Sequence, residues 1–223
     1  MPKFFVNSEQ IKQNNINIEG NDVNHIKNVL RKKIDDEIII CDASKSKDYL
    51  CRILDVDEDK IICKIEAELE TKVESNIDVT IFQGLPKADK MELIIQKSVE
   101  LGAYDITPIE LKRCVVKLNE KEKTKKIERW QKISEVAAKQ CGRSIIPQIN
   151  NIISIQDVCN LCNKYDIVLV AYENEEENSL KQEINKLKEM KKQSDENIKI
   201  AILVGPEGRN RCKRNRKVER QRS

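Results

Sequence analysis

Two short polar turns follow the most apolar stretches of the sequence. Residues Tyr172–Glu175 come after Ile167–Ala171, and Gly205–Gly208 (GPEG) comes after Ile200–Val204. Continuous apolar runs are typical of central parallel strands, and open α/β sheets bind ligands beyond the carboxyl ends of such strands. Glycine also lets backbone donors approach a ligand closely. The GPEG turn therefore indicates either a ligand-binding loop or a plain strand-ending turn. The sequence has no P-loop or GxGxxG pattern, which argues against ordinary kinases and dinucleotide enzymes.

A second set of residues with binding potential is basic. These residues stand at or near the ends of expected helices and strands, where they can reach a phosphate backbone: Lys87, Lys90, Lys112, Arg113, Lys117, Lys139 and Arg143. A solvated surface explains the lysines equally well. It explains Arg113 and Arg143 less well, because arginine is rare before residue 209 and a guanidinium binds phosphate through two hydrogen bonds.

The eight cysteines do not form the pattern of a metal site. Most lie in apolar runs and are typical of small buried side chains in a reducing compartment. Cys159 and Cys162 form a CxxC pair, but no second pair follows and His25 is the only histidine, whereas structural zinc takes four ligands. We expect both cysteines to face the core from a helix, and no metal to be bound.

Residues 1–70 are expected to form a β-rich module. Apolar residues at helical spacing predict a short helix within Asp22–Arg31, and β-prone runs follow at Ile38–Cys41, Tyr49–Val56 and Ile61–Ile65. This order favours a compact β-barrel-like unit. Residues 66–76, which are polar and lack periodicity, are the expected linker.

From residue 77 onward, strands alternate with longer helices, which is typical of an α/β sheet covered on both faces. Helices are expected over Ala88–Leu101 and Glu120–Cys141, each followed by a glycine, and from the capping residue Ser154. The expected strands are Val79–Gln83, Ile106–Ile109, Ile167–Ala171 and Ile200–Val204. These elements place both polar turns at the carboxyl edge of one sheet.

With 223 residues, the chain is long enough for one or two packed domains. It has neither the roughly 18 consecutive apolar residues of a spanning helix nor a signal peptide, so we expect a cytoplasmic protein without a membrane partner. Its net charge is +3, but residues 209–223 hold eight of the 41 basic and one of the 38 acidic residues. The remainder carries 33 bases against 37 acids, so net charge gives no argument for a nucleic-acid partner.

Several segments together resemble the RsmE family of RNA methyltransferases, which belongs to the SPOUT class. The resemblance covers nearly all of residues 2–208 and rests on Lys3–Val6 (KFFV), Gln83–Glu92 (QGLPKADKME), Gln96–Gly102 (QKSVELG), Gly142–Ser144 (GRS) and Leu203–Gly208 (LVGPEG). The family has arginine in place of Lys3. The resemblance implies a PUA-like RNA-binding domain over residues 1–70 and a SPOUT α/β domain over residues 77–208, whose chain threads a trefoil knot.

The same resemblance implies an enzyme that transfers a methyl group from S-adenosyl-L-methionine to N3 of a uridine in small-subunit (16S) ribosomal RNA. It implies that Arg143 is catalytic, near the target base or its phosphate. The implied cofactor-binding residues are Glu173, Val204, Gly205, Glu207 and Gly208. The implied RNA-binding residues are Lys3, Arg31, Lys87, Lys90 and Arg113. The intact family is expected to form homodimers.

After Gly208 the resemblance ends. The family continues with a second glycine, an acidic helix and a Leu-Gly-x-Arg-Ile-Leu-Arg segment that completes the cofactor pocket, the knot and much of the dimer contact. Residues 209–223 are instead either a basic RNA-binding tail or the product of a frameshift. The frameshift is suggested by a back-translation: if these residues are encoded by A/T-rich codons, the same bases read one base later encode a charged amphipathic helix. We expect a frameshift, an incomplete knot and impaired activity of the chain as written.

The main alternative is a non-catalytic RNA-binding protein that uses the N-terminal module and the basic residues without methyl transfer. A methyl-incorporation assay beside an RNA-binding assay separates it from the enzyme. An unrelated α/β phosphate-binding enzyme has only the GPEG turn in its favour.

Overall fold

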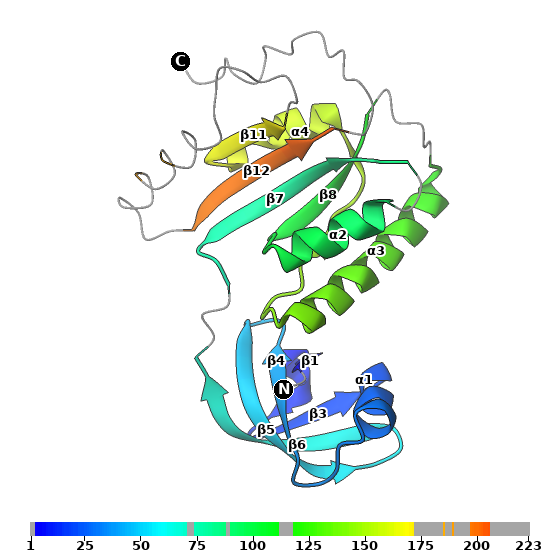
Figure 1. The fold of residues 1–223 in the computed structure, drawn as a ribbon, viewed down its shortest axis with the longest axis vertical. Helices are drawn as coiled ribbons and strands as arrows, with labels where there is room; N and C mark the ends of the chain where they lie inside the picture. Colours follow the sequence, from blue (N-terminus) through cyan, green and yellow to red (C-terminus); the bar gives the residue numbers. More distant parts are fainter. Residues whose placement is uncertain are drawn as a thin grey trace. The chain divides into compact units, whose positions relative to one another are not determined.

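The computed structural model describes residues 3–70, 74–87, 90–111, 118–171 and 197–205, together with residues 185 and 189. The chain divides into two compact units, both drawn in Figure 1. Unit 1 consists of Met1–Glu74 and Glu135–Ile146, and unit 2 of Ser75–Ser134 and Pro147–Ser223. Unit 1 is thus discontinuous in sequence, and the inclusion of Glu135–Ile146 was not part of the expected 1–70 domain.

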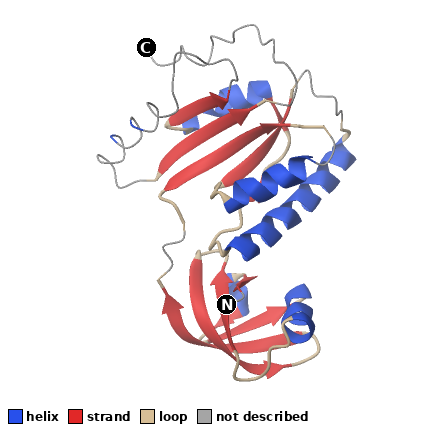
Figure 2. Ribbon diagram, viewed as in Figure 1, coloured by secondary structure: helices blue, strands red, loops and turns tan. Residues whose placement is uncertain are grey.

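Unit 1 is built on a curled six-stranded sheet (Figure 2). Its strand order is β1-β4-β5-β6-β3-β2, with β1 parallel to β4 and the other neighbours antiparallel. The strands are β1 (Lys3–Val6), β2 (Ile11–Lys12), β3 (Asn15–Glu19), β4 (Glu37–Asp42), β5 (Lys47–Val56) and β6 (Lys60–Leu69). Two register shifts between β5 and β6 bend this long hairpin, and the bend lets the sheet curl around its own core.

Alternating side chains of these strands fill the core of unit 1, and a short helical segment closes it. The buried residues include Phe4, Val6, Ile16, Ile18, Ile38, Ile40, Cys51, Ile53, Ile61 and Cys63. The helical segment consists of α1 (Asn21–Asn24) and a π-helical turn η2 (His25–Val29), which add Val23 and Ile26 to the core. A 3₁₀ turn, η1 (Ser8–Gln10), joins β1 to β2. The predicted helix within Asp22–Arg31 is confirmed as this segment.

Unit 2 contains a parallel sheet of order β10-β8-β7-β12-β11, with β9 paired to β8. Its strands are β7 (Ile77–Gly84), β8 (Asp105–Glu110), β9 (Gln148–Ile149), β10 (Ile153–Ser154), β11 (Ile167–Ala171) and β12 (Ile198–Val204). Its helical segments are α2 (Lys90–Glu100), α3 (Glu120–Cys141), α4 (Ile155–Leu161) and the 3₁₀ turn η3 (Cys162–Lys164). The last residues of α3, from Glu135, belong to unit 1.

The order of the connections decides which face of the sheet each helix covers. The chain moves in one direction across the sheet from β7 through α2 to β8 and through α3 to β9, and it returns from β10 through α4 to β11. Because such crossovers are right-handed, α2 and α3 cover one face and α4 the other, as Figure 2 shows. The predicted fold class, a curled β-rich unit followed by an α/β unit, is confirmed. The trefoil knot, expected to be incomplete in this chain, stays a prediction.

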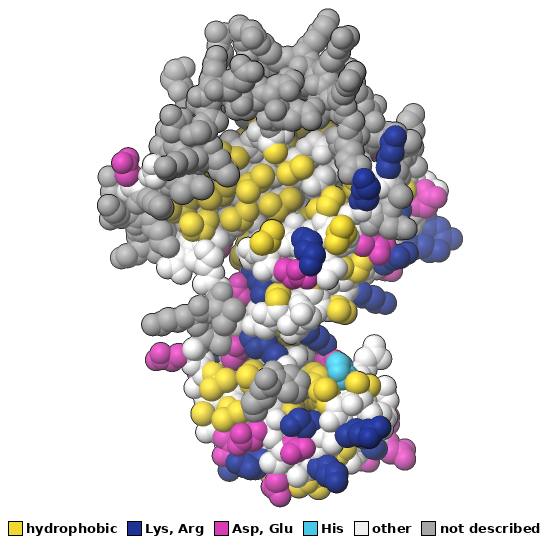
Figure 3. Space-filling view, in the orientation of Figure 1, with side chains coloured by type: hydrophobic (Ala, Val, Ile, Leu, Met, Phe, Trp, Pro, Cys, Tyr) yellow, Lys and Arg dark blue, Asp and Glu magenta, His cyan; other side chains and the backbone are white. Residues whose placement is uncertain are grey.

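The sheet of unit 2 is apolar on both faces. On the α4 face, Val158 packs with Phe82, Ile109 and Ala201. On the opposite face, the buried Ile198 and Ile200 are surrounded by partly buried aliphatic side chains, which Figure 3 shows gathered over β7, β12 and β11: Ile77, Val79, Ile167, Leu169 and Ile202. Apolar residues on both faces are the reason why β11 and β12 read as continuous apolar runs.

Replacement of a core residue of unit 1 tests the packing described above. Ile53 in β5 is fully buried, whereas its neighbour Leu54 is 41% exposed. Ile53→Ala should lower the free energy of unfolding by about 2–5 kcal/mol, because it removes buried methyl groups and leaves a cavity. Leu54→Ala is the matched control and should cost less than 1 kcal/mol, on the order of a surface change. Urea unfolding of the full chain measures both, and equal losses would contradict the assigned register.

Candidate functional site

The predicted cofactor residues that are described lie at the carboxyl edge of the sheet of unit 2. Val204 is the last residue of β12, and it pairs with Gln83 of β7 and Ala171 of β11. Gly205 follows it. The carboxyl ends of three neighbouring strands therefore meet beside Val204 and Gly205, where open parallel sheets bind their ligands. Three further predicted residues, Glu173, Glu207 and Gly208, lie outside the described residues.

Gln83 is a polar residue at this edge to which the sequence analysis gave no role. It is 5% exposed, and its side-chain Nε2 donates to the carbonyl oxygen of Gly84 at 2.9 Å. A buried amide beside the last residue of the neighbouring strand is the kind of polar group that orients a ligand in an otherwise apolar site. The signal in the sequence was a glutamine as the last residue of the expected strand Val79–Gln83.

Two of the predicted RNA-binding lysines follow the same edge along the chain. Lys87 comes three residues after the end of β7, and Lys90 is the first residue of α2; both are exposed. A cation in these positions can contact a phosphate without displacing buried structure. Their contact with RNA stays a prediction. Arg113 lies outside the described residues.

Arg31 is exposed in unit 1, just after the π-helical turn η2. Its φ of 52° lies in the left-handed region, where the residue that ends a helix is usually glycine. The amides of Leu30 and Lys32 donate to the carbonyl oxygens of His25 and Ile26 at 2.9 and 3.0 Å, which is how this turn closes the helix. The side chain of Arg31 is therefore presented at a helix end, and its RNA contact stays a prediction.

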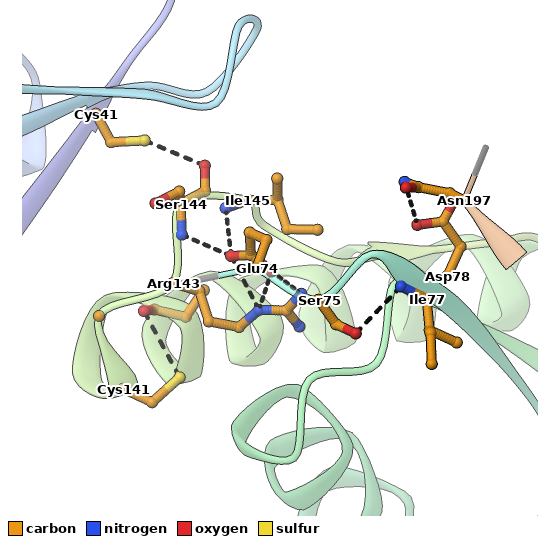
Figure 4. A network of polar contacts seen from close by, with 12 residues as sticks. Cys41, Glu74, Ser75, Ile77, Asp78, Cys141, Arg143, Ser144, Ile145 and Asn197 are labelled. Atoms are coloured by element: carbon orange, nitrogen blue, oxygen red, sulfur yellow. Dashed lines mark hydrogen bonds and ion pairs between the residues drawn. The ribbon is translucent and has the colours of Figure 1, made fainter. Parts of the chain in front are cut away.

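Arg143, the predicted catalytic residue, lies in a buried ion pair within unit 1 (Figure 4). Its Nη2 donates to Oε2 of Glu74 at 2.6 Å, its Nε donates to the same oxygen at 3.2 Å, and 6% of its side chain is exposed. The Glu74 carboxylate also accepts the backbone N–H groups of Ser144 at 2.8 Å and Ile145 at 3.2 Å. Glu74 thus gathers four donors from three consecutive residues. The catalytic role of Arg143 stays a prediction.

These donors determine the acidity of Glu74. Burial raises the pKa of the Glu74 carboxyl, but the hydrogen bonds from Arg143, Ser144 and Ile145 and the charge of Arg143 lower it more. The pKa therefore lies below its ordinary value, and the carboxylate is the form that the folded protein stabilises.

Lys3 occupies the other side of the same loop. Its Nζ lies 2.6 Å from Oδ2 of Asp48, and it donates to the carbonyl oxygens of Gly142 at 3.1 Å and Arg143 at 3.0 Å and to Oγ of Ser144 at 3.2 Å. The side chains of Lys3 and Asp48 are 7% and 1% exposed. Because four oxygen atoms surround its ammonium, Lys3 stabilises the fold of unit 1. It can contact RNA only if these hydrogen bonds break. The RNA contact of Lys3 stays a prediction.

Ser144 and Cys41 complete this buried network. Oγ of Ser144 donates to Oδ2 of Asp48 at 3.1 Å, and Sγ of Cys41 donates to the carbonyl oxygen of Ser144 at 3.1 Å. Burial raises the pKa of the Cys41 thiol, and Asp48 raises it further. At the end of α3, Lys139 forms an ion pair with Asp22 at 2.8 Å. The loop after α3 is therefore held by β1, β4, β5 and Glu74.

The part of the chain that is described contains no group of three or more histidine, cysteine or acidic residues placed to hold a metal ion. Cys159 lies in α4 and Cys162 begins η3; both are half-buried, and Sγ of Cys162 donates to the carbonyl oxygen of Val158 at 3.3 Å. Among the same residues, no helix combines the length and the apolar character needed to cross a membrane.

Removal of the Lys3 ammonium should strongly destabilise unit 1. Oδ1 of Asp48 has no hydrogen-bond partner among the described residues, so Lys3→Met leaves a buried carboxylate with little compensation. We expect a loss of about 3–5 kcal/mol in the free energy of unfolding. Lys47→Met removes an exposed pair with Glu68 and should cost about 0–1 kcal/mol. Urea unfolding measures both variants, and Lys3→Arg should restore most of the loss if the cation is what matters.

The lowered pKa of Glu74 predicts a dependence of stability on pH. A carboxyl whose folded pKa lies below its unfolded value contributes stability above the unfolded pKa, near 4.5, and loses it as the pH falls through the folded pKa. Glu74→Gln should therefore be less stable than the wild-type chain at pH 7, and the difference should shrink below pH 4.5. A difference that grew on acidification would contradict the assigned ion pair.

Known protein families match both parts of the chain. A family model of RNA methyltransferase domains matches residues 73–209, and one of RNA methyltransferase PUA domains matches residues 18–66. The ribosomal RNA small subunit methyltransferase E of Bacillus subtilis is 36% identical, over 93% of this chain and 81% of the relative. That of Mesomycoplasma hyopneumoniae is 31% identical, over 93% and 82%.

A solved structure of the same kind of methyltransferase also resembles this chain. The ribosomal RNA small subunit methyltransferase E of Neisseria gonorrhoeae, solved bound to S-adenosyl methionine, is 26% identical with a TM-score of 0.71, over 92% of this chain and 80% of its own. Two domain matches in the order of the two units, and relatives matched over most of their length, show the family. The chain belongs to the RsmE family of RNA methyltransferases, enzymes that combine a PUA domain with a SPOUT-class methyltransferase domain.

Proposed function

We propose that this chain is an enzyme for the methylation of N3 of a specific uridine in small-subunit (16S) ribosomal RNA, with S-adenosyl-L-methionine as the methyl donor. The observation that carries the proposal is the match of a PUA domain and an RNA methyltransferase domain in one chain. The names of the relatives supply the substrate, since they act on ribosomal RNA of the small subunit. We place the protein in the cytoplasm, where ribosomal RNA is found in bacteria.

The residues at the carboxyl edge of unit 2 fit the proposed cofactor. Val204 ends the apolar strand β12, and Gly205, which follows it, offers its backbone groups without a side chain in the way. Gln83 adds a buried amide beside them. We propose that this edge, with Glu173, Glu207 and Gly208, holds S-adenosylmethionine. When bound, the cofactor supplies a positively charged methylsulfonium whose methyl group can be transferred.

The chemistry of uridine defines what the side chains must do. N3 carries a proton at neutral pH, and this proton must leave before the nitrogen lone pair can form the bond to the methyl carbon. The protein therefore has to hold the base in line with the methyl group and stabilise negative charge on the uracil ring. We propose Arg143 for the second task, from a position beside the target base or its phosphate, because a positively charged guanidinium attracts the developing negative charge.

Recognition of the RNA is proposed to use separate cations in the two units. Arg31 is exposed in unit 1, and Lys87 and Lys90 are exposed after β7 in unit 2. Together with Lys3 and Arg113, these residues are the proposed contacts to phosphate groups. Phosphate contacts position a substrate and supply affinity, while the target base is selected by the shape of the site. Enzymes of this family are proposed to act as homodimers.

Residues 209–223 lie outside the described residues, and the match to the methyltransferase family model reaches only residue 209. We propose that these residues are read out of frame and therefore do not form the segment that closes the cofactor pocket. Methyl transfer by the chain as written is then impaired. The nucleotide sequence after the Gly208 codon tests the frame directly.

A methyl-transfer assay tests the proposed function. Small subunits that lack the modification are incubated with labelled S-adenosylmethionine and either this chain or a chain whose frame is shifted by one base after the Gly208 codon. We expect the shifted chain to label one uridine, and the modified N3 to stop reverse transcription because its Watson–Crick edge is blocked. The chain as written should transfer at least about tenfold less.

The same assay separates the alternatives. RNA binding by both chains without methyl transfer by either would support the non-catalytic RNA-binding protein instead. Equal transfer by both chains would overturn the proposed impairment and leave the proposed reaction standing.

A further inference from the structure

We propose that residues 143–145 form a phosphate-binding site of unit 1, and that the carboxylate of Glu74 occupies this site until an RNA phosphate displaces it. Glu74 then acts as an internal competitor for the phosphate. The inference rests on the proposed function in one respect, because it takes the displacing phosphate to belong to RNA.

The donors around Glu74 are those that phosphate requires. Two come from the guanidinium of Arg143, at 2.6 and 3.2 Å from Oε2, and two are the consecutive backbone N–H groups of Ser144 and Ile145, at 2.8 and 3.2 Å from Oε1. A guanidinium binds phosphate and carboxylate through the same pair of hydrogen bonds. Consecutive backbone N–H groups that converge on one point form a common anion-binding element. The loop is therefore built for an anion with several oxygen atoms.

The loop is held in shape independently of Glu74. Lys3 binds the carbonyl oxygens of Gly142 and Arg143 from the opposite side, and Asp48 and Cys41 bind Ser144 through its hydroxyl and its carbonyl oxygen. None of these contacts uses the Glu74 carboxylate. The four donors can thus keep their orientation when the carboxylate leaves, which is the condition for exchanging one anion for another.

Glu74 is also the partner that solvent can reach. Its side chain is 24% exposed, whereas that of Arg143 is 6% exposed. Glu74 lies in the segment between β6 and β7, outside both strands. A phosphate arriving from solution therefore meets the carboxylate at the outer side of the site, and Arg143 stays in place while the anion is exchanged.

A competitor of this kind weakens RNA binding more as the fraction of molecules whose site is open becomes smaller. The apparent dissociation constant equals the intrinsic one divided by the fraction of molecules whose site is open. If Glu74 leaves the site open in about one molecule in ten, its removal tightens binding about tenfold. A purely structural ion pair predicts the opposite sign, because its loss loosens the loop and weakens binding.

The site itself is tested with inorganic phosphate. Full-length Glu74→Ala, Glu74→Gln and wild-type chains are titrated with phosphate while the backbone amide signals of Ser144 and Ile145 are followed by NMR. We expect both amides to shift in all three chains, at phosphate concentrations about tenfold lower in Glu74→Ala than in the wild type. Glu74→Gln keeps the size of the side chain and guards against loss of fold, which the melting temperature checks. Amides that do not respond to phosphate in a folded Glu74 variant overturn the inference.

RNA binding tests the competition. Fluorescence anisotropy with a 16S ribosomal RNA fragment at several salt concentrations should give about tenfold tighter binding for Glu74→Gln, and a salt dependence that corresponds to about one more phosphate contact. The matched control is Glu68→Gln, which removes a carboxylate paired with Lys47 in the same unit but bound to no backbone N–H group of the 143–145 loop. It should change affinity less than twofold.

The two arms distinguish the possible failures. Equal or weaker RNA binding by a folded Glu74→Gln overturns the competition, as does an equal gain in Glu68→Gln, which reduces the effect to net charge. If no variant binds RNA while phosphate still shifts Ser144 and Ile145, the proposed function fails and the anion site stands.

Discussion

The buried pair of Lys3 and Asp48 is the interaction on which the organisation of this protein depends. Two charges removed from water must be compensated by close partners, and Lys3 finds them in Asp48, a serine hydroxyl and two carbonyl oxygens of the loop after α3. The loop and the first β-strand therefore stabilise each other. This mutual requirement is the physical reason why Glu135–Ile146 belongs to unit 1 although most of α3 belongs to unit 2.

The chain passes between the two units after Glu74, after Ser134 and after Ile146. Two of these points lie next to the network around Arg143, since Glu74 and Ile145 take part in it. Units 1 and 2 are thus joined by three covalent connections rather than by one linker. A change in the hydrogen bonds of the Glu74 carboxylate therefore affects residues next to two of these connections, namely Glu74 itself and Ile145.

Elements defined by local patterns could be predicted from the sequence. The helix Glu120–Cys141 and the strand Ile167–Ala171 have the predicted bounds, because an apolar stripe with a following glycine and a continuous apolar run need no distant partner. The strand Asn15–Glu19 was missed, since it is rich in asparagine and is held by pairing with β6. The sequence also suggested surface roles for Lys3 and Arg143, because their partners Asp48 and Glu74 are far away in the chain. The positions of Val204 and Gly205 were predictable from the rule that parallel strands bind ligands at their carboxyl ends.

The thiol of Cys41 gives the protein a chemical reporter of its own. Because the thiol is buried and its pKa is raised, it cannot react with an alkylating reagent until the loop at Ser144 moves away. Cys51 and Cys63 lie in the core of the same unit, where exposure requires the sheet itself to open. The order in which these thiols become reactive therefore separates a local opening of the loop from unfolding of the whole unit.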